Sequence, residues 1–292
     1  MLINFQGTRF SKFTGMISRQ FFIMGVAVCV MLGCKKDPSI WKIENLNGNK
    51  ISVFGHGGMG EHYRYPMNSF ESLMECLSLA TDGTEMDVCV TKDSVLVLSH
   101  SQNLEEETSC SGQIKNKTWT ELEGCKFTSP LFSKADLITA AYFFDRIEYK
   151  NNRIFTFDCK ITLEDSPEYL ELFATSLLRH IETHGLVSHC FIESFNSDFL
   201  KLLQGKNKDL HLFLYSPDYL TGLNVSKSLN LYGLTLDTKN ISQEDIKQAH
   251  QQGLRITLFN TSTEHENLEA VAKSPDFIQT DKVEYLINAL YP

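Results

Sequence analysis

The sequence lacks three features that would each point to a common class of protein. It has no C-x-x-C pair, which argues against a zinc or thioredoxin-type site. It has no excess of basic residues, because 27 Lys plus Arg stand against 36 Asp plus Glu. It also has no apolar run that reaches the roughly 20 residues of a comfortable membrane span. A hydrophobic fraction of 42% and a charged fraction of 22% are typical of a globular protein.

The N-terminal segment differs in composition from the rest of the chain. Residues 1–33 carry three positive charges and no acid, and they end in the apolar run "FFIMGVAVCVML" before Gly33 and Cys34. This pattern predicts an export signal. The ending "MLGC" resembles the bacterial lipobox, in which the cysteine is lipidated and becomes the first mature residue. We therefore expect a membrane-anchored bacterial lipoprotein, periplasmic or at the cell surface, with a plain signal peptide or an N-terminal anchor as the alternative.

Without residues 1–33 the chain has 24 Lys plus Arg against 36 Asp plus Glu, a net charge of −12. Such an acidic surface argues against nucleic acid or anionic lipid as the main partner, and nothing in the sequence indicates a protein partner. A buried cationic metal site remains compatible with this charge. Six cysteines follow Cys34, and export permits disulfides, but the pairing cannot be read from the sequence.

Short apolar runs alternate with helical patterns along most of the chain, after a polar tether at residues 34–49. The eight expected strands are 51–55, 84–90, 153–159, 190–195, 210–215, 231–237, 254–260 and 276–280. Eight strands alternating with helices are the number expected of a (β/α)8 TIM barrel, although an open doubly wound sheet would show the same alternation. Residues 94–99 suggest a short extra strand. Residues 101–152 form a long inserted segment between the second and third barrel strands, of the kind that is commonly functional.

The motif Gly55-His-Gly-Gly-Met-Gly60 fits the G-x-G-x-x-G of a dinucleotide-binding loop. Such a loop must run directly into a helix whose N-terminus holds the pyrophosphate. Here "EHYRYP" follows, and the helical pattern begins only after Pro66. We therefore interpret the match as accidental.

Polar residues gather where the expected strands end, which is where a barrel enzyme keeps its catalytic groups. Two pairs, Glu85 with Asp87 and Asp158 with Lys160, have the i, i+2 spacing that directs both side chains to one face of a strand. The other polar residues at these places are His56, His100, Glu193 and the pair Thr280-Asp281.

Three converging carboxylates would repel one another unless a cation binds between them. Oxygen ligands suit Ca²⁺ or Mg²⁺, and two neighbouring histidines are candidates for general acid and base. A cation together with an acid and a base describes phosphodiester hydrolysis well.

The chain resembles the glycerophosphodiester phosphodiesterase family, within the phosphatidylinositol phospholipase C-like barrel superfamily, over residues 51–292. The pieces that carry the resemblance are "GHGGMG…YPMNSFESL", "DGTEMDVCVTKDSVLVLSH", "TSCSGQI…TWTEL", "FDCK", "IESFN", "AHQQGLRITLFN" and "FIQTDKVEYL". The resemblance implies one phosphodiesterase barrel domain at residues 50–292, with the segment 101–152 helping to cover the substrate.

The resemblance also implies roles for individual residues. Glu85, Asp87 and Asp158 correspond to metal ligands, and His56 and His100 correspond to the acid–base pair. Lys160 corresponds to a cation that contacts the phosphate, while Glu193 is expected in the wall of the site. The implied reaction cleaves a small glycerophosphodiester to an alcohol and sn-glycerol 3-phosphate.

Three positions depart from the family pattern. Gly57 stands where the family has an arginine, Met67 replaces the acid of its "PENT" motif, and Asp158 replaces a glutamate. Arg64 is a candidate to replace the missing phosphate contact. The missing arginine also motivates the alternative function of a catalytically weakened barrel that binds phosphorylated lipid head groups or glycans. The two retained histidines favour the enzyme, because a binder has no need of proton-transfer groups.

Overall fold

The computed structural model describes residues 41–128, 135–148 and 150–291. The expected signal segment, the lipidation site Cys34 and the first part of the tether lie outside these residues. No helix within the described ranges is long and apolar enough to cross a membrane.

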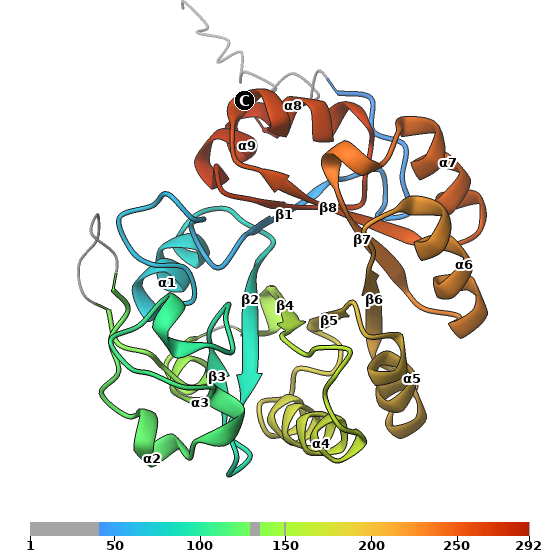
Figure 1. The fold of residues 1–292 in the computed structure, drawn as a ribbon. Coiled ribbons are helices and arrows are strands. Elements are labelled where there is room, and N and C mark those ends of the chain that lie inside the picture. The colour runs from blue at the N-terminus through green and yellow to red at the C-terminus, as the bar shows by residue number, and fades with distance from the viewer. Residues whose placement is uncertain (1–40, 129–134, 149, 292) are drawn as a thin grey trace, which may run out of the picture. The chain divides into compact units, whose positions relative to one another are not determined.

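Eight parallel strands close into a barrel, which confirms the predicted (β/α)8 fold (Figure 1). The strands are β1 (Ser52–Gly55), β2 (Gly83–Val90), β4 (Ile154–Cys159), β5 (Cys190–Ser194), β6 (His211–Tyr215), β7 (Gly233–Asp237), β8 (Arg255–Thr261) and β9 (Phe277–Thr280). Strand β1 pairs in parallel with both β2 and β9 and so closes the ring. Each strand lies within two residues of its predicted bounds at either end.

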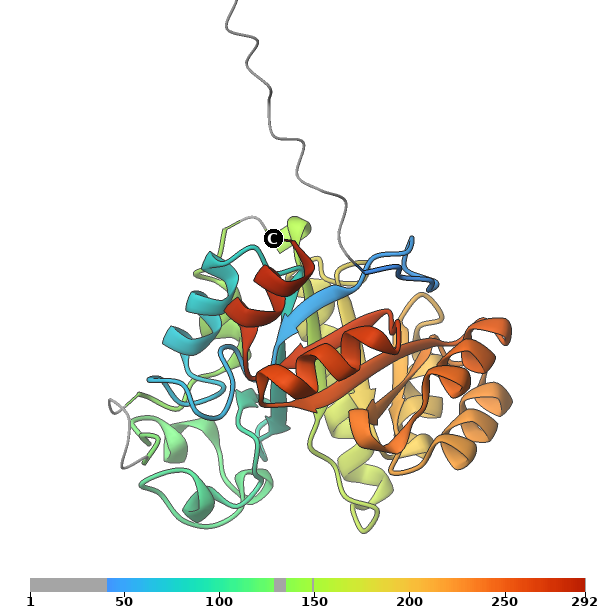
Figure 2. The same cartoon turned by 90° about the horizontal axis from the view of Figure 1, so that it is seen from above.

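Helices surround the ring of strands (Figure 1). They are α1 (Phe70–Ser78), α2 (Trp119–Leu122), α3 (Ala140–Phe144), α4 (Pro167–Thr183), α5 (Ser197–Lys206), α6 (Tyr219–Leu229), α7 (Gln243–Gln251), α8 (Glu264–Ala272) and α9 (Val283–Leu290). Hydroxyl side chains begin several of them: Ser166 caps α4 ahead of Pro167, and Ser242 forms a capping box with Asp245 at α7. Figure 2 shows α9 beside β1, so the two ends of the described chain meet.

Alternate residues of each strand face the barrel interior and the surrounding helices. The helix-facing residues, such as Phe155 and Phe157 of β4, join the main hydrophobic core. The interior holds a separate aromatic cluster of Phe54, Phe191, Phe213 and Phe277. Phe54 and Phe277 are stacked with ring centroids 5.6 Å apart. These aromatic side chains therefore fill part of the barrel interior.

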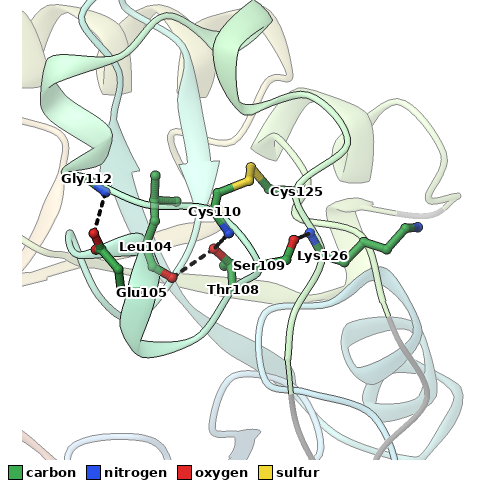
Figure 3. The surroundings of a disulfide bond; sticks show 8 residues. All are labelled: Leu104, Glu105, Thr108, Ser109, Cys110, Gly112, Cys125 and Lys126. Atoms are coloured by element: carbon green, nitrogen blue, oxygen red, sulfur yellow. Dashed lines mark hydrogen bonds between the residues drawn. A yellow bond between two sulfur atoms is a disulfide. The ribbon is translucent and has the colours of Figure 1, made fainter.

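The chain between β2 and β4 contains a short antiparallel strand, β3 (Leu96–Leu98), which pairs with β2 where an extra strand was predicted. Residues after β3 pack around their own apolar cluster, which includes Leu104, Ile114 and Leu122. A disulfide joins Cys110 to Cys125 in this region (Figure 3). Short local hydrogen bonds support it, among them one from the Thr108 hydroxyl to the Leu104 carbonyl at 2.8 Å. We call residues 101–128 the disulfide loop.

Candidate active site

Two adjacent strands bring three carboxylates together at the C-terminal end of the barrel. Glu85 and Asp87 extend from β2, and Asp158 extends from β4, where it is the register partner of Asp87. One carboxylate oxygen from each residue lies within 4.8 Å of the other two. Glu85 and Asp87 are buried, with 2% and 1% of their surfaces exposed. The i, i+2 spacing seen in the sequence therefore produces a real cluster of acidic side chains.

Backbone and amide groups fix the orientation of two of these carboxylates. The backbone N–H of Gly57 donates to Oε2 of Glu85 at 2.7 Å. The amide of Asn68 donates from Nδ2 to Oδ2 of Asp87 at 2.7 Å and accepts from the Asp87 N–H at 3.0 Å. Asn68 has a φ of 63°, a left-handed conformation that asparagine tolerates better than most residues. Sequence reasoning did not assign Asn68 a role.

The electrostatics of the cluster suit a cation. Burial, together with the neighbouring charges of Asp87 and Asp158, raises the pKa of Glu85 well above its ordinary value. Lys160 places Nζ 2.7 Å from Asp87 and 2.6 Å from Asp158. Burial alone would raise the pKa of Asp87, but Lys160 and the two histidines outweigh it and lower that pKa to about 2. The single positive charge of Lys160 thus faces three carboxylates. Carboxylate oxygens are ligands that suit Mg²⁺ or Ca²⁺.

His56 follows β1 and is held by a carboxylate from the opposite end of the sequence. Its Nδ1 lies 2.8 Å from Oδ1 of Asp281, the residue after β9. An ionised carboxylate can only accept a hydrogen bond, so Nδ1 of His56 carries the proton in this contact. Nε2 is then the ring nitrogen that is available to accept or donate a proton. Burial lowers the pKa of His56, but the hydrogen bond and charge of Asp281 reverse this, and the net shift is upward.

His100 follows β3 and has a similar arrangement with a residue of the disulfide loop. Its Nδ1 lies 3.3 Å from Oε1 of Glu107, and half of the His100 side chain is exposed. The hydrogen bond to Glu107 is the main cause of a raised His100 pKa. The charge of Asp87 also raises the His100 pKa, as it does that of His56. Each histidine therefore has a carboxylate on one nitrogen and the acidic cluster nearby.

Two other predicted residues form hydrogen bonds outside the acidic cluster, although Glu193 on β5 is the register partner of Asp158. Glu193 is buried and accepts from Thr235 Oγ1 at 2.7 Å and from Gln279 Nε2 at 2.9 Å. Burial is the main reason that its pKa is raised to about 7. Arg64 is not brought to the carboxylates: its Nη2 contacts the two oxygens of Glu75 at 2.6 and 2.7 Å, and its guanidinium lies over neighbouring tyrosine rings. A phosphate contact from Arg64 would require breaking this pair.

Gly57, directly after His56, occupies a position that a larger residue does not fit. Its φ is 54°, and a Cβ added there would lie 2.5 Å from the Cβ of Met67. Met67 thus fills the space beside Gly57. Gly57 and Met67, which replace the family's arginine and the acid of its "PENT" motif, are therefore packed against each other.

Two cavities bear on where a substrate binds. A small one of about 160 Å³ is lined by Met67, Phe127 and several carboxylates, including Glu107, the partner of His100. A larger one of about 920 Å³ is lined by residues at the N-terminal ends of β6 to β8. In a TIM barrel the N-terminal face lies opposite the catalytic groups. The smaller cavity, although less spacious, is the one that borders the candidate site.

Comparisons with known proteins agree with this geometry. Residues 56–285 match the glycerophosphoryl diester phosphodiesterase family. A glycerophosphodiester phosphodiesterase of Caldanaerobacter subterraneus subsp. tengcongensis is 23% identical over 244 residues, which cover 82% of this chain and 97% of that protein. One of Bacillus altitudinis is 22% identical, over 78% of this chain and 94% of that protein.

Solved structures show the same fold. A glycerophosphodiester phosphodiesterase from Parabacteroides distasonis superposes with a TM-score of 0.71 and 21% identity, covering 82% of this chain and 96% of the other. An Oleispira antarctica phosphodiesterase, solved in complex with the product sn-glycerol-3-phosphate, has a TM-score of 0.70 and 16% identity with the same coverage of both chains.

Proposed function

Because the chain belongs to the glycerophosphoryl diester phosphodiesterase family and is a phosphoric diester hydrolase, we propose that it cleaves glycerophosphodiesters to an alcohol and sn-glycerol 3-phosphate. The observation that carries this proposal is the acidic cluster of Glu85, Asp87 and Asp158 beside two histidines that are each held by a carboxylate. The product complex of the Oleispira antarctica phosphodiesterase supports the same reaction.

The acidic cluster would hold a divalent cation, Ca²⁺ or Mg²⁺. The fit rests on the convergence of three carboxylate oxygens and on the raised pKa of Glu85, which reflects burial and the neighbouring charges of Asp87 and Asp158. Such a cation would neutralise part of the phosphate charge and stabilise the charge that develops during cleavage. Lys160, already between Asp87 and Asp158, is placed to contact an anionic phosphate beside them.

The two histidines divide the proton transfers. One imidazole takes a proton from the attacking hydroxyl or water, and the other donates a proton to the oxygen of the departing alcohol. Asp281 holds His56 in the tautomer that presents Nε2, and Glu107 does the same for His100. Asp281 and Glu107 act through the histidines, so we regard them as positioning residues.

The chain is also proposed to be exported and anchored to a bacterial membrane through a lipid on Cys34, on the periplasmic side or at the cell surface. The disulfide between Cys110 and Cys125 supports export, because structural disulfides form and persist in oxidising compartments. Growth with a labelled fatty acid tests the anchor. Label in the full chain that is lost in Cys34→Ala supports it, and an unlabelled full chain refutes it.

Metal removal and add-back test the catalytic proposal. The purified protein is treated with chelator, and phosphomonoester release is followed after addition of Ca²⁺, Mg²⁺ or Mn²⁺. The substrates are glycerophosphocholine, glycerophosphoethanolamine, glycerophosphoglycerol and glycerophosphoinositol. We expect metal-dependent turnover that His56→Ala and Asp87→Asn abolish, while Arg64→Ala, at a residue paired with Glu75, keeps it. Binding of these compounds without turnover under any metal would instead favour the alternative, a barrel that binds phosphorylated head groups or glycans.

A further inference from the structure

The larger of the two cavities lies on the N-terminal face of the barrel, and the proposed reaction uses none of its residues. It measures about 920 Å³, which is within the range of pockets that hold small molecules. Residues of the segments 201–212, 229–232 and 253–255 line it, and we call it the basal cavity. These segments comprise the second half of α5, the end of α6 and the loops that lead into β6, β7 and β8 (Figure 1). The Gln204 amide donates to the Leu229 carbonyl at 2.9 Å and so joins the ends of α5 and α6.

Positive charge exceeds negative charge on the wall of the basal cavity. Lys201, Lys208 and Arg255 line it together with one carboxylate, that of Asp209. Within the described residues none of these three cations forms an ion pair, whereas Lys206 on the same helix is paired with a glutamate of α4. Lys206 is also the basic residue in the last turn of α5, so the negative end of that helix does not account for the other cations.

Arg255, the first residue of β8, is held in place by aromatic rings and not by a carboxylate. Its guanidinium lies over the ring of Tyr232, with 4.2 Å between the guanidinium carbon and the ring centroid. Stacking of this kind orients the guanidinium but leaves its charge in place. The carboxylate of Asp276, whose charge acts on Tyr232, already accepts hydrogen bonds at both oxygens, from a backbone N–H and from a histidine ring, each at 2.8 Å.

His211, the first residue of β6, packs on the other residues of this group and contains an unsatisfied polar atom. The centroids of the His211 and Tyr232 rings are 4.1 Å apart. Within the described part of the chain, the buried Nδ1 of His211 has no hydrogen-bond partner. Such an atom lowers the stability of the fold. Local costs of this kind are expected where residues serve binding more than stability.

The charge of the wall indicates the class of ligand. Three cations and one carboxylate leave a surplus of two positive charges, and a phosphate monoester carries a charge of about −1.5 to −2 at pH 7. The guanidinium of Arg255 offers paired N–H donors that suit phosphate oxygens, and lysines add compact charges. From this arrangement we propose that the basal cavity binds a phosphate monoester, carried either by a free small molecule or by the head group of a lipid. This site is separate from the catalytic one.

Gly205 provides a position where the cavity can be changed without disturbing the fold. It lies near the end of α5, one helical turn after Lys201, and both residues line the cavity. A Cβ added at Gly205 would meet no atom within 4 Å. Gly205→Glu therefore introduces a negative charge at the cavity, and Gly205→Gln introduces a side chain of the same size without the charge.

Calorimetry with soluble ligands tests the proposal. The purified protein is titrated in chelator, so that no metal ion at the acidic cluster attracts phosphate. The probes are glucose 6-phosphate and, as the uncharged control, glucose. We expect saturable binding of glucose 6-phosphate and none of glucose. Gly205→Glu should weaken the binding about tenfold or more, because it places like charges together, and Gly205→Gln should change it less than about twofold.

A second pair of variants removes charge instead of adding it. Lys208→Gln should weaken the binding of glucose 6-phosphate about fivefold, the upper end of the effect of one exposed charge. Lys247→Gln is the matched control, since Lys247 is an exposed lysine of α7 that does not line the basal cavity. That control should leave the affinity unchanged.

Vesicles distinguish the two sources of the phosphate monoester. The protein is sedimented with phosphatidylcholine vesicles that either contain or lack phosphatidic acid. Binding that requires phosphatidic acid and is weakened by Gly205→Glu supports the basal cavity with a lipid as its ligand. Binding of glucose 6-phosphate alone supports it with a free small molecule as its ligand.

Other results overturn the proposal. If neither glucose 6-phosphate nor phosphatidic acid binds, or if Gly205→Glu binds them as tightly as Gly205→Gln does, the basal cavity is not a phosphate site. Hydrolysis of glycerophosphodiesters is a separate readout, because the cavity lies on the face opposite the catalytic groups. Gly205→Glu should therefore leave the hydrolysis unchanged, and a failure of the proposed function would leave the binding result as it stands.

Discussion

The Nδ1 nitrogen of His56 and the Oδ1 oxygen of Asp281 are 2.8 Å apart, although 225 positions separate them in the sequence. His56 follows the first barrel strand and Asp281 follows the last, and β1 and β9 are paired along their length. The contact therefore links His56, the proposed proton-transfer residue, to the point where the barrel closes.

Asp281→Asn should slow the reaction and change its pH dependence. Asp281 raises the pKa of His56, so its replacement lowers that pKa and moves the limb of the kcat/KM profile governed by His56 to lower pH. We expect kcat to fall about 10- to 100-fold with little change in KM, as for other residues that orient a catalytic group. Asp237→Asn, at the end of β7, is the control, and an unshifted pH limb in Asp281→Asn would refute the positioning role.

Glu85→Gln should stabilise the metal-free protein and abolish its response to metal. The substitution removes one of three neighbouring carboxylates, two of which are buried, while leaving an oxygen to accept from the Gly57 N–H. Wild type should gain about 2.7 kcal/mol of unfolding free energy when a divalent cation is present at 100 times its Kd. Unfolding in chelator and in excess metal measures both effects.

Glu193→Gln provides the control for that experiment, because Glu193 is equally buried but bonds Thr235 and Gln279. It should keep the metal-induced rise in Tm. If Glu85→Gln also kept that rise, the acidic cluster would not be the metal site.

Gly57→Ala should destabilise the fold more than an alanine at a comparable glycine. Gly124 also has a positive φ, of 90°, but has no atom within 4 Å of an added Cβ. Gly124→Ala should cost about 1 kcal/mol from backbone strain alone. Gly57→Ala adds the collision with Met67 and should cost roughly 3 kcal/mol, measured by urea unfolding.

The same contact bears on reinstating the family's arginine. Gly57→Arg alone should be poorly folded, and a second change, Met67→Gly, should recover part of the lost stability. Equal stabilities for the two alanine variants would show that Met67 does not restrict position 57.

Replacing Cys110 and Cys125 with serine should loosen the disulfide loop and, through it, the active site. A disulfide that closes a loop of about 15 residues contributes roughly 3 kcal/mol. Glu107 belongs to this loop, so His100 should lose its orientation and kcat should fall. Faster proteolysis within residues 101–128 is the structural readout. Cys190→Ser, at a buried free cysteine, should show neither effect, and full activity of the double variant would disconnect the loop from catalysis.

Acid should weaken the fold through His180, a buried residue on α4. Burial first, and then the charge of His184, lower the pKa of His180 to about 3. The unfolded chain takes up a proton near pH 6.5 while the folded chain does not, so stability falls as the pH drops from 6.5 toward 3. The loss is up to about 5 kcal/mol.

His180→Leu should flatten this dependence, as measured by urea unfolding at several pH values. The control is His265→Leu, since the His265 side chain is 79% exposed. A pH dependence in His180→Leu identical to that of wild type would exclude His180 as its source.

Alternating apolar residues and helix caps are local signals, and they were enough to predict the strands and helices. The same alternation also fits an open doubly wound sheet, so the closed barrel was predicted only with the help of the family resemblance. The acidic cluster could be predicted from the sequence because Glu85 and Asp87 share one strand, and the barrel brings β4 with Asp158 beside that strand. The partners of these groups come from distant segments with no periodic pattern. Asn68 lies in a loop before α1, and Glu107 lies in the disulfide loop, whose path no local rule determines. Asp281 was noted as a strand-end residue, but its pairing with His56 required the closed barrel.

The partner of Arg64 was likewise not predictable from the sequence. A cation near a predicted phosphate site was the natural substitute for a missing arginine, yet Glu75, eleven residues away and carried by α1, engages its guanidinium. A flexible side chain can have several possible partners nearby. The geometry of the loop decides which of them it contacts, and composition and spacing do not encode that geometry.

The closure of the barrel between β1 and β9 also has a consequence for the biogenesis of the enzyme. The backbone N–H of His56 donates to the Thr280 carbonyl at 3.1 Å, and Asp281 holds the imidazole, so both contacts require that β9 and the residue after it have joined the barrel. A nascent or C-terminally clipped chain that already contains every carboxylate of the acidic cluster still lacks an oriented His56. Docking of the final strand against the first is therefore the event that orients His56.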